Sequence, residues 1–285
     1  MTEAERAPIL LTGASGRVGH MVLRHWPRAR VGVVPQYRRG APRGGLLWVP
    51  ATGPRALLEY QAQRATRFRA LVMLSGVTPG EGRDVTQNRA IAEATLVGAQ
   101  AAGINRVIVA SSSAVYGAGE GFAEEDRCAP ANPYGAAKLD MEAACARWRD
   151  RGLEVCALRI GNVAGADALL VNAARNAGQI TLDCFADGTG PLRSYIGPRS
   201  LAEALATLCL LDGPLPQVLN IAAPVPITMA ALAQEAGATI RSRPAPPTAH
   251  QRITLDCRRI AAFHPFAPAE SVPSEMVRQW RTASP

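Results

Sequence analysis

The sequence predicts an α/β fold, in which a doubly wound parallel sheet is covered by helices on both faces. Three observations support this prediction. Short, continuous apolar segments recur up to residue 162, segments of helix length separate them, and a glycine-rich turn follows the first apolar segment. Strands that are buried on both faces form such unbroken apolar runs, and strands that alternate with helices pair in parallel.

The elements follow in order along the chain. The expected strands are residues 9–12, 31–34, 45–49, 70–76, 106–113 and 153–162, and the expected helices follow Gly16 or span about 55–67, 88–102 and 133–151. Ligands of such sheets bind beyond the carboxyl ends of the strands. This rule places four segments on one rim: 13–19, 75–76, 111–113 and residue 162. Residues 241–250, RSRPAPPTAH, are expected to form a surface loop.

Length and composition describe a globular chain. Its 285 residues suffice for one large domain or a domain with a subdomain, and 48% are hydrophobic against 19% charged. No apolar run approaches the roughly 20 residues that span a bilayer, and the first residues, MTEAERAPILLTG, do not resemble a signal peptide. The six cysteines have no zinc-site spacing. We therefore expect a cytoplasmic protein with reduced thiols, no membrane contact and no bound metal.

The net charge of +8 is concentrated near the N-terminus, where residues 1–58 hold nine arginines and two acids. No basic patch interleaved with aromatic residues and no recognition motif accompanies it, so nucleic acid is not an expected partner. An anionic small molecule that binds this part of the chain explains the asymmetry better.

The stretch TGASGRVG provides a site for such a ligand. Gly13 permits a tight turn, Gly16 lets the backbone approach a pyrophosphate, and Gly19 lets the next helix pack against the strand. The free N–H groups at the start of that helix suit phosphates. A dinucleotide is therefore expected to contact Gly13, Ser15, Gly16, Arg17, Val18 and Gly19.

The stretch NPYGAAKLDME, residues 132–142, contains the only lysine of the chain, Lys138. Asn132 is a suitable N-cap, with Pro133 at the first helical position. Tyr134 and Lys138 are four residues apart, so their side chains project from one face of the helix. A neighbouring cation lowers the pKa of a tyrosine from about 10 and favours its phenolate. A solvated helix face is the competing interpretation, and the placement of the sole lysine favours catalysis.

Four motifs, TGASGRVG, SSSAVYG, PYGAAK and LRIGNVAG, occur in the order of the extended short-chain dehydrogenase/reductases. Over residues 8–222 the chain resembles that group, the NAD-dependent epimerase/dehydratase family. The resemblance implies a Rossmann-type dinucleotide-binding domain and a small C-terminal substrate-binding subdomain. The implied boundaries are 1–162 with about 190–222 for the first, and about 163–189 with 223–285 for the second.

The resemblance also implies the catalytic roles. Tyr134 would be the general acid/base, and Lys138 would lower its pKa and bind the nicotinamide ribose. Ser112, which lies four residues before Tyr116, would hydrogen-bond the reacting carbonyl or alcohol. Ser113 is the second candidate for that role.

Further binding residues follow from the same resemblance. The implied cofactor neighbours also include Leu74, Ser75, Gly76 and Asn88. Asn88 is equally well explained as a helix cap. Asn162 and Arg193 match residues that contact substrate phosphate in sugar-nucleotide members, although a turn asparagine and a surface arginine are the alternatives, and Ser200 replaces a usual aspartate. The sequence permits a homodimer through the helices at 88–102 and 133–151.

The cofactor is expected to be NADP(H), with NAD(H) as the alternative. In NAD-binding members an acidic residue ends the second strand, whereas this chain has no acid between Glu5 and Glu59. It reads VVPQYRRG there, and Arg38, Arg39 and Arg17 suit a 2′-phosphate. The competing explanation is a generally arginine-rich composition.

The reaction is narrowed by the residues that the chain lacks. Dehydratases of the family carry an Asp-Glu pair where this chain has Ser113 and Ala114, and the Cys and His of the epimerase-reductases have no matching residues. Carbonyl reduction or alcohol oxidation of a sugar-like or small polar substrate remains the first expectation. A nucleotide-sugar 4-epimerase that retains NAD is the second, and a non-catalytic NADPH-binding sensor is the third. The sequence does not indicate the substrate.

Overall fold

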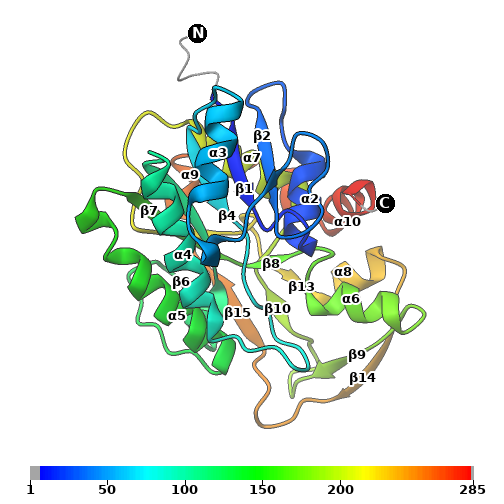
Figure 1. The fold of residues 1–285 in the computed structure, drawn as a ribbon. Helices are drawn as coiled ribbons and strands as arrows, with labels where there is room; N and C mark the ends of the chain where they lie inside the picture. The colour runs from blue at the N-terminus through cyan, green and yellow to red at the C-terminus, as the bar shows by residue number, and fades with distance from the viewer. Residues whose placement is uncertain (1–6, 284–285) are drawn as a thin grey trace.

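The computed structural model describes residues 7–283 and is built around a seven-stranded sheet. The strand order is β12-β7-β5-β4-β1-β2-β3, and every neighbouring pair is parallel. The bounds are β1 (Ile9–Thr12), β2 (Val33–Tyr37), β3 (Leu46–Leu47), β4 (Ala70–Met73), β5 (Arg106–Ser112), β7 (Glu154–Ile160) and β12 (Val218–Ile221). Because the order runs outward from β1 in both directions, the sheet is doubly wound, and the predicted Rossmann-type α/β fold is confirmed (Figure 1).

Helices cover both faces of this sheet (Figure 1). On one face lie α3 (Arg55–Gln63), α4 (Gln87–Ala101) and α5 (Pro133–Ala146), and on the other lie α2 (Arg17–His25), α7 (Pro198–Leu210), α9 (Arg258–Ala261) and α10 (Pro273–Ala283). Strand β1 illustrates the reason for its unbroken apolar sequence. Ile9 and Leu11 face the second helix layer, whereas Leu10 faces the first.

A smaller group of elements lies beyond the carboxyl ends of the central strands, at the bottom of Figure 1. It contains a four-stranded sheet of order β13-β10-β15-β6 and the pairs β8–β11 and β9–β14. The bounds are β6 (Gly119–Phe122), β8 (Asn162–Val163), β9 (Gln179–Cys184), β10 (Leu192–Arg193), β11 (Tyr195–Ile196), β13 (Ile227–Thr228), β14 (Thr239–Pro244) and β15 (Arg252–Leu255). Helices α6 (Ala168–Arg175) and α8 (Met229–Glu235) pack on β9 and β14.

Several predicted boundaries were wrong. The second strand begins at Val33 rather than Val31, because the Val31 amide donates to the Pro27 carbonyl in a turn. The strand expected at 45–49 is only Leu46–Leu47. The helix expected at 133–151 ends at Ala146, and the short 3-10 helix η3 (Arg149–Arg151) follows. The loop expected at 241–250 starts as strand, because residues up to Pro244 pair with β9.

The C-terminal helix α10 caps helix α7. Gln279, which is 1% exposed, accepts hydrogen bonds from the backbone amides of Arg199 and Ser200 at 3.0 and 3.1 Å. Its amide nitrogen donates to the Ser200 hydroxyl at 3.1 Å. A Cβ on Gly197 would lie 2.1 Å from the Gln279 oxygen, so only glycine leaves room for this contact. Ser200 is thus a helix-packing residue at the position where the family usually has an aspartate.

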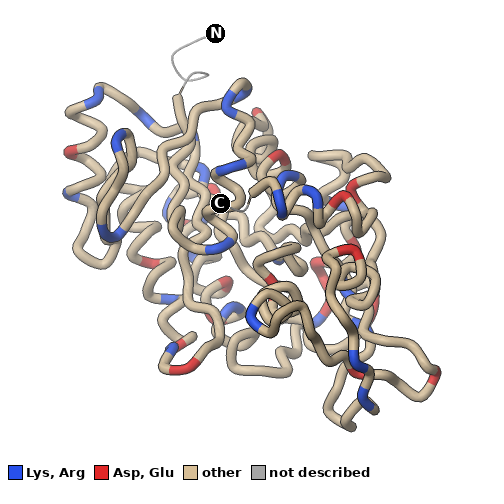
Figure 2. Tube along the Cα trace, turned by 90° about the vertical axis from the view of Figure 1, so that its right-hand side faces the viewer, with Lys and Arg blue, Asp and Glu red and all other residues tan. Residues whose placement is uncertain are grey.

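Positions of Lys, Arg, Asp and Glu are spread along the described part of the chain (Figure 2). No helix in the described part of the chain is both long and apolar enough to cross a membrane.

Candidate active site

The glycine turn is pressed against the end of β4. Gly13 has φ +77°, and a Cβ on it would lie 2.5 Å from the Ser75 amide nitrogen. A Cβ on Gly19 would lie 2.1 Å from the Gly13 carbonyl oxygen, so α2 begins in direct contact with the turn. The Thr12 and Ser75 hydroxyls are hydrogen-bonded at 3.0 Å. Backbone rather than side chains therefore forms this part of the rim, as a pyrophosphate site requires.

A cavity of about 530 Å³ opens above this turn. Its lining residues come from the turn, the ends of β2 and β4, the short 3-10 helix η1 (Pro50–Thr52) and α4, and they are Gly13, Ser15, Gly16, Gln36, Arg38, Pro50, Ala51, Leu74, Ser75, Gly76, Val77, Gln87, Ala90 and Ile91. Six residues of the predicted cofactor set are not among them: Arg17, Val18, Gly19, Arg39, Asn88 and Lys138. The glycine backbone and the open volume fit the adenosine and pyrophosphate part of a dinucleotide.

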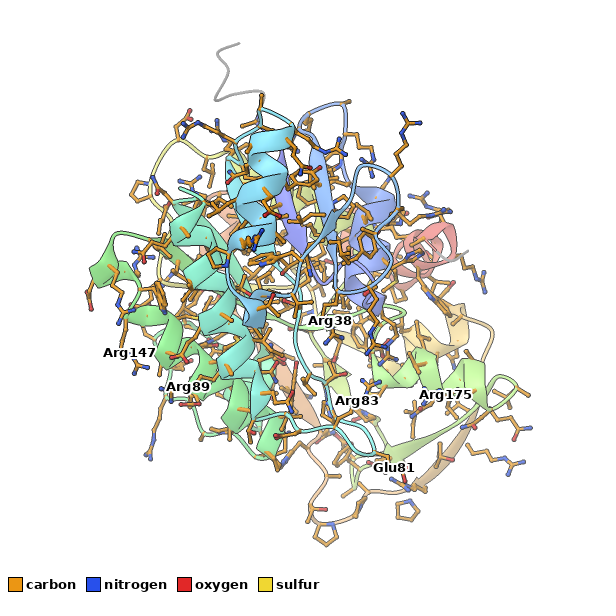
Figure 3. All side chains as sticks on the ribbon, viewed as in Figure 1. Arg38, Glu81, Arg83, Arg89, Arg147 and Arg175 are labelled. Atoms are coloured by element: carbon orange, nitrogen blue, oxygen red, sulfur yellow. The ribbon has the colours of Figure 1, made fainter. Side chains whose placement is uncertain are left out.

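Arg38 carries the only charge among the described residues that line this cavity. It lies at the end of β2, where the strand meets the glycine turn, near the middle of Figure 3. Its side chain is exposed, so the guanidinium is available to an anionic ligand. Arg38 therefore lies on the wall of the cavity in which a dinucleotide is expected.

Gln36 is a site residue that the sequence analysis missed. It is 3% exposed, and its side-chain oxygen accepts from the Gly13 amide at 3.1 Å. Its amide nitrogen donates to the Trp48 carbonyl. Both ends of the side chain are therefore engaged with backbone. The indication in the sequence was a polar amide at the end of an apolar strand, beside the more conspicuous Arg38.

Lys138 is buried beneath the rim of the cavity. It is 4% exposed, and its ammonium donates to the Ala110 carbonyl at 2.8 Å. A Cβ on Gly76 would lie 3.4 Å from the ammonium nitrogen, which places Lys138 beside a lining residue of the cavity. Burial lowers the pKa of Lys138 from 10.5 to about 8.

Tyr134 and Ser112 meet Lys138 at this place. Asn132 caps α5 as predicted, since its side chain accepts from the Gly135 amide at 2.9 Å, and Lys138 lies 6.0 Å from the Tyr134 ring centroid. Burial raises the pKa of Tyr134, and a hydrogen bond with the Ser112 side chain opposes this effect. The three predicted catalytic side chains thus converge.

The three serines of the SSSAVYG motif occupy different positions. Ser111 donates to the Glu142 carboxylate, inside the protein. Ser113 begins the short 3-10 helix η2 (Ser113–Val115), where the Ser112 oxygen also accepts from the Ala114 amide at 3.2 Å. Ser112 is therefore the serine of this run that is placed beside Tyr134.

Asn88 fixes the loop that follows β4. Its side chain accepts from the Val77 amide at 2.9 Å and donates to the carbonyls of Val77 and Val85 at 2.9 and 2.8 Å. It is fully buried, and the N-cap of α4 is Thr86 instead. Asn88 therefore shapes the wall of the cavity through the backbone, because its polar atoms are already paired.

Asn162 and Arg193 lie near each other at the edge of the smaller part. The backbone N–H of Asn162 donates to the backbone carbonyl of Ser194, which is the neighbour of Arg193, at 2.8 Å. The Arg193 guanidinium donates to the carbonyls of Leu192, Gln251 and His250 at 2.7, 2.8 and 2.7 Å. Within residues 7–283 no carboxylate forms a salt bridge with Arg193, and its guanidinium is held by these three backbone carbonyls.

Among the described residues, no group of three or more His, Cys, Asp or Glu side chains could hold a metal ion.

A protein-family model, described as the NAD dependent epimerase/dehydratase family, matches residues 9–222. The chain belongs to this family. A curated relative, a UDP-glucose 4-epimerase of Azospirillum brasilense, is 34% identical over 176 residues, which are 56% of this chain and 50% of that protein. The alignment thus spans half the length of that relative.

Solved structures of the family share the fold. A UDP-glucose 4-epimerase of Stenotrophomonas maltophila, with bound NAD and formylated UDP-arabinopyranose, has a TM-score of 0.79 at 19% identity over 98% of both chains. A UDP-N-acetylglucosamine 4-epimerase of Methanobrevibacter ruminantium, in complex with UDP-N-acetylmuramic acid, has a TM-score of 0.75 at 18% identity, covering 98% of this chain and all of that one.

Proposed function

We propose that the protein is an NAD(P)-dependent oxidoreductase that interconverts a carbonyl and an alcohol, with NADP(H) as the favoured cofactor. The observation that carries this proposal is the convergence of Ser112, Tyr134 and Lys138 beside the cavity of the glycine turn. A sugar-like or small polar molecule is the proposed substrate. Its phosphate or carboxylate, where it has one, would lie near Arg193 and Asn162.

Each of the three side chains has a role that its surroundings support. A bound nicotinamide would supply or accept the hydride. Tyr134 donates a proton to the substrate oxygen in reduction and removes it in oxidation. Because burial makes its phenolate costly, Tyr134 needs a nearby cation, which Lys138 provides. Ser112 hydrogen-bonds the same substrate oxygen and positions it beside Tyr134.

The preference for NADP(H) rests on the end of β2. The two polar ends of Gln36 are occupied by the Gly13 amide and the Trp48 carbonyl, so this side chain offers no free acceptor pair for ribose hydroxyls. Among the described residues, Arg38 is the one charged residue that lines the cavity. A guanidinium there favours a 2′-phosphate over a free hydroxyl.

A 4-epimerase acting on a sugar nucleotide is the second candidate. The 34% identity to a UDP-glucose 4-epimerase favours it, and the same three side chains would serve. The two candidates differ in the cofactor, because an epimerase reduces and reoxidises a retained NAD, whereas a reductase exchanges NADP(H) at each turnover.

Calorimetric titration with NADPH and NADH tests the proposal, after the absorbance spectrum of the purified protein has been checked for bound cofactor. We expect an empty protein that binds NADPH more tightly. Arg38→Ala should remove this preference by weakening NADPH binding about tenfold or more, without changing NADH binding. Arg43→Ala is the matched control, because Arg43 is likewise exposed, does not line the cavity and has no role assigned to it at the cofactor site.

Tightly retained NAD, together with conversion of UDP-glucose into UDP-galactose, would establish the epimerase and refute the reductase. Equal affinity for the two cofactors in the unsubstituted protein would refute the role assigned to Arg38.

A further inference from the structure

A buried ion pair lies directly behind the catalytic helix. Glu142 is one helical turn beyond Lys138 on α5, and Arg159 is on the neighbouring strand β7; they are 7% and 5% exposed. The Arg159 guanidinium donates to both carboxylate oxygens, with its Nη2 at 2.8 Å from Oε2 and its Nε at 3.2 Å from Oε1 and Oε2. Ser111 donates to the same carboxylate. Glu142 is therefore held from two strands at once.

The pair continues into a chain of polar contacts. Arg159 Nη1 donates to the Tyr116 hydroxyl at 2.8 Å, and this hydroxyl donates to Asn220 Oδ1 at 2.8 Å. The Asn220 amide nitrogen donates to the carbonyls of Phe122 and Asp256, at 2.7 and 3.2 Å. The network thus joins the catalytic helix, the serine loop and β12 to the end of β6 and the residue that follows β15.

Stability alone does not explain such a pair. Removing two charges from water costs several kcal/mol per ion, and apolar residues of similar size often stabilise a fold equally well. Every partner in the network is nevertheless a polar side chain or a carbonyl in hydrogen-bond contact. The position of Glu142 relative to Lys138 indicates another purpose.

We propose that Glu142, held by Arg159, is a positioning residue that keeps the Lys138 ammonium charged and in place beneath the cofactor cavity. This inference rests on the proposed function for the role of Lys138, but the arrangement of charges can be tested by itself.

The surroundings of Lys138 show why Glu142 matters. On its own helix Lys138 has Tyr134, Glu142 and Cys145 as titratable neighbours. The other elements around it contribute uncharged groups: the Ala110 carbonyl from β5, Gly76 from the loop after β4, and Asn88 from α4.

Cys145 is neutral at ordinary pH, because burial raises the pKa of its thiol to about 12. The carboxylate of Glu142 therefore provides the negative charge on this side of the ammonium, and its attraction opposes the effect of burial on the Lys138 pKa. Arg159 in turn holds the Glu142 carboxylate in position through three hydrogen bonds.

The single lysine makes a direct measurement feasible. Protein grown with lysine labelled with carbon-13 at Cε contains one labelled side chain, so its NMR resonance reports the titration of Lys138 without assignment. Glu142→Gln removes the anion and leaves the Arg159 charge uncompensated, so the Lys138 pKa should fall by about one unit or more. Arg159→Met leaves Glu142 unpaired, so the Lys138 pKa should rise.

The Lys138 pKa is expected to shift in opposite directions in the two variants. This difference distinguishes an effect of charge from a general loosening of the fold. If either substitution only admitted water, the Lys138 pKa would rise toward its ordinary value in both variants. Glu154→Gln is the matched control, because Glu154 pairs with Arg106 at the far end of the same two strands, β5 and β7. It should leave the Lys138 resonance unchanged.

If the single variants do not fold, the double variant Glu142→Gln/Arg159→Met can be measured instead, because it removes both charges of the ion pair. The Lys138 pKa should still fall in that protein, because the Glu142 carboxylate, which opposes the effect of burial on the ammonium, has been removed. An unchanged or raised Lys138 pKa after loss of Glu142 would overturn the inference. Absence of turnover in the unsubstituted protein, with the expected titration shifts, would instead refute the proposed function and leave the positioning role intact.

Discussion

Replacement of Lys138 by methionine should stabilise the cofactor-free protein while abolishing turnover. The ammonium is 4% exposed and has lost most of its hydration. Its pKa falls from 10.5 in the unfolded chain to about 8 in the folded protein. This difference of about 2.5 units corresponds to about 3 kcal/mol by which folding is opposed when the lysine is charged.

One loss offsets part of this gain. The ammonium donates to the Ala110 carbonyl at 2.8 Å, and methionine leaves that carbonyl without its donor at a cost of about 1 kcal/mol. The Lys138→Met protein should therefore be more stable than the unsubstituted protein by about 2 kcal/mol at pH 7.

The effect has a defined pH window. Between pH 8 and pH 10.5 the unfolded chain binds the lysine proton and the folded chain has lost it, so the stability of the unsubstituted protein rises with pH there. The variant has no such group. The variant should have its full advantage of about 2 kcal/mol below pH 8. This advantage should shrink as the pH rises, pass through zero before pH 10.5 and become a deficit approaching about 1 kcal/mol above it, because only the loss at the Ala110 carbonyl remains.

Urea denaturation of both cofactor-free proteins at a series of pH values measures this difference, and the other titrating groups cancel in the comparison. Bound cofactor must be removed first, because it would stabilise the unsubstituted protein by mass action. A variant that is no more stable at pH 7, or a difference that does not shrink as the pH rises, would show that Lys138 is not desolvated as described.

Three further substitutions test other parts of the site. Tyr134→Phe should abolish turnover and leave the cofactor dissociation constant unchanged in calorimetry; loss of both would make Tyr134 a structural residue. Gly19→Ala places a Cβ 2.1 Å from the Gly13 carbonyl oxygen, so it should destabilise the fold by about 1–3 kcal/mol in urea denaturation and weaken cofactor binding; a normal protein would contradict the close packing of α2. Gln279→Ala removes the cap of α7 and should cost about 1–2 kcal/mol, with cofactor affinity unchanged; a loss of affinity would mean that α10 also shapes the cavity.

The parts of the site that were predictable from the sequence are those that depend on neighbours along the chain. Gly13 and Gly19 are identified by spacing, because a strand, a tight turn and a helix must follow one another within a few residues. Tyr134 and Lys138 share a face because the helical repeat is local. The cap at Asn132 was predicted for the same reason, and the structure contains it.

The contacts that the sequence does not reveal are those between residues that are distant in sequence. Gln36 is explained only by the Gly13 amide, 23 residues away, and by the Trp48 carbonyl. Arg193 donates to carbonyls 57 and 58 residues further along. A sequence identifies such residues as polar, but the packing of the sheets determines which polar groups they meet.

The single lysine of this arginine-rich chain is explained by the same packing. The space around the Lys138 ammonium is bounded by the Ala110 carbonyl at 2.8 Å, the Met141 sulfur at 3.8 Å and the backbone of Gly76. A compact ammonium fits between these groups, whereas a planar guanidinium would need more room and more acceptors. An ammonium can also be partly discharged by burial, to a pKa of about 8, while a guanidinium remains charged. The position therefore requires a small cation whose charge depends on Glu142 and on burial, and among the basic side chains lysine meets that requirement.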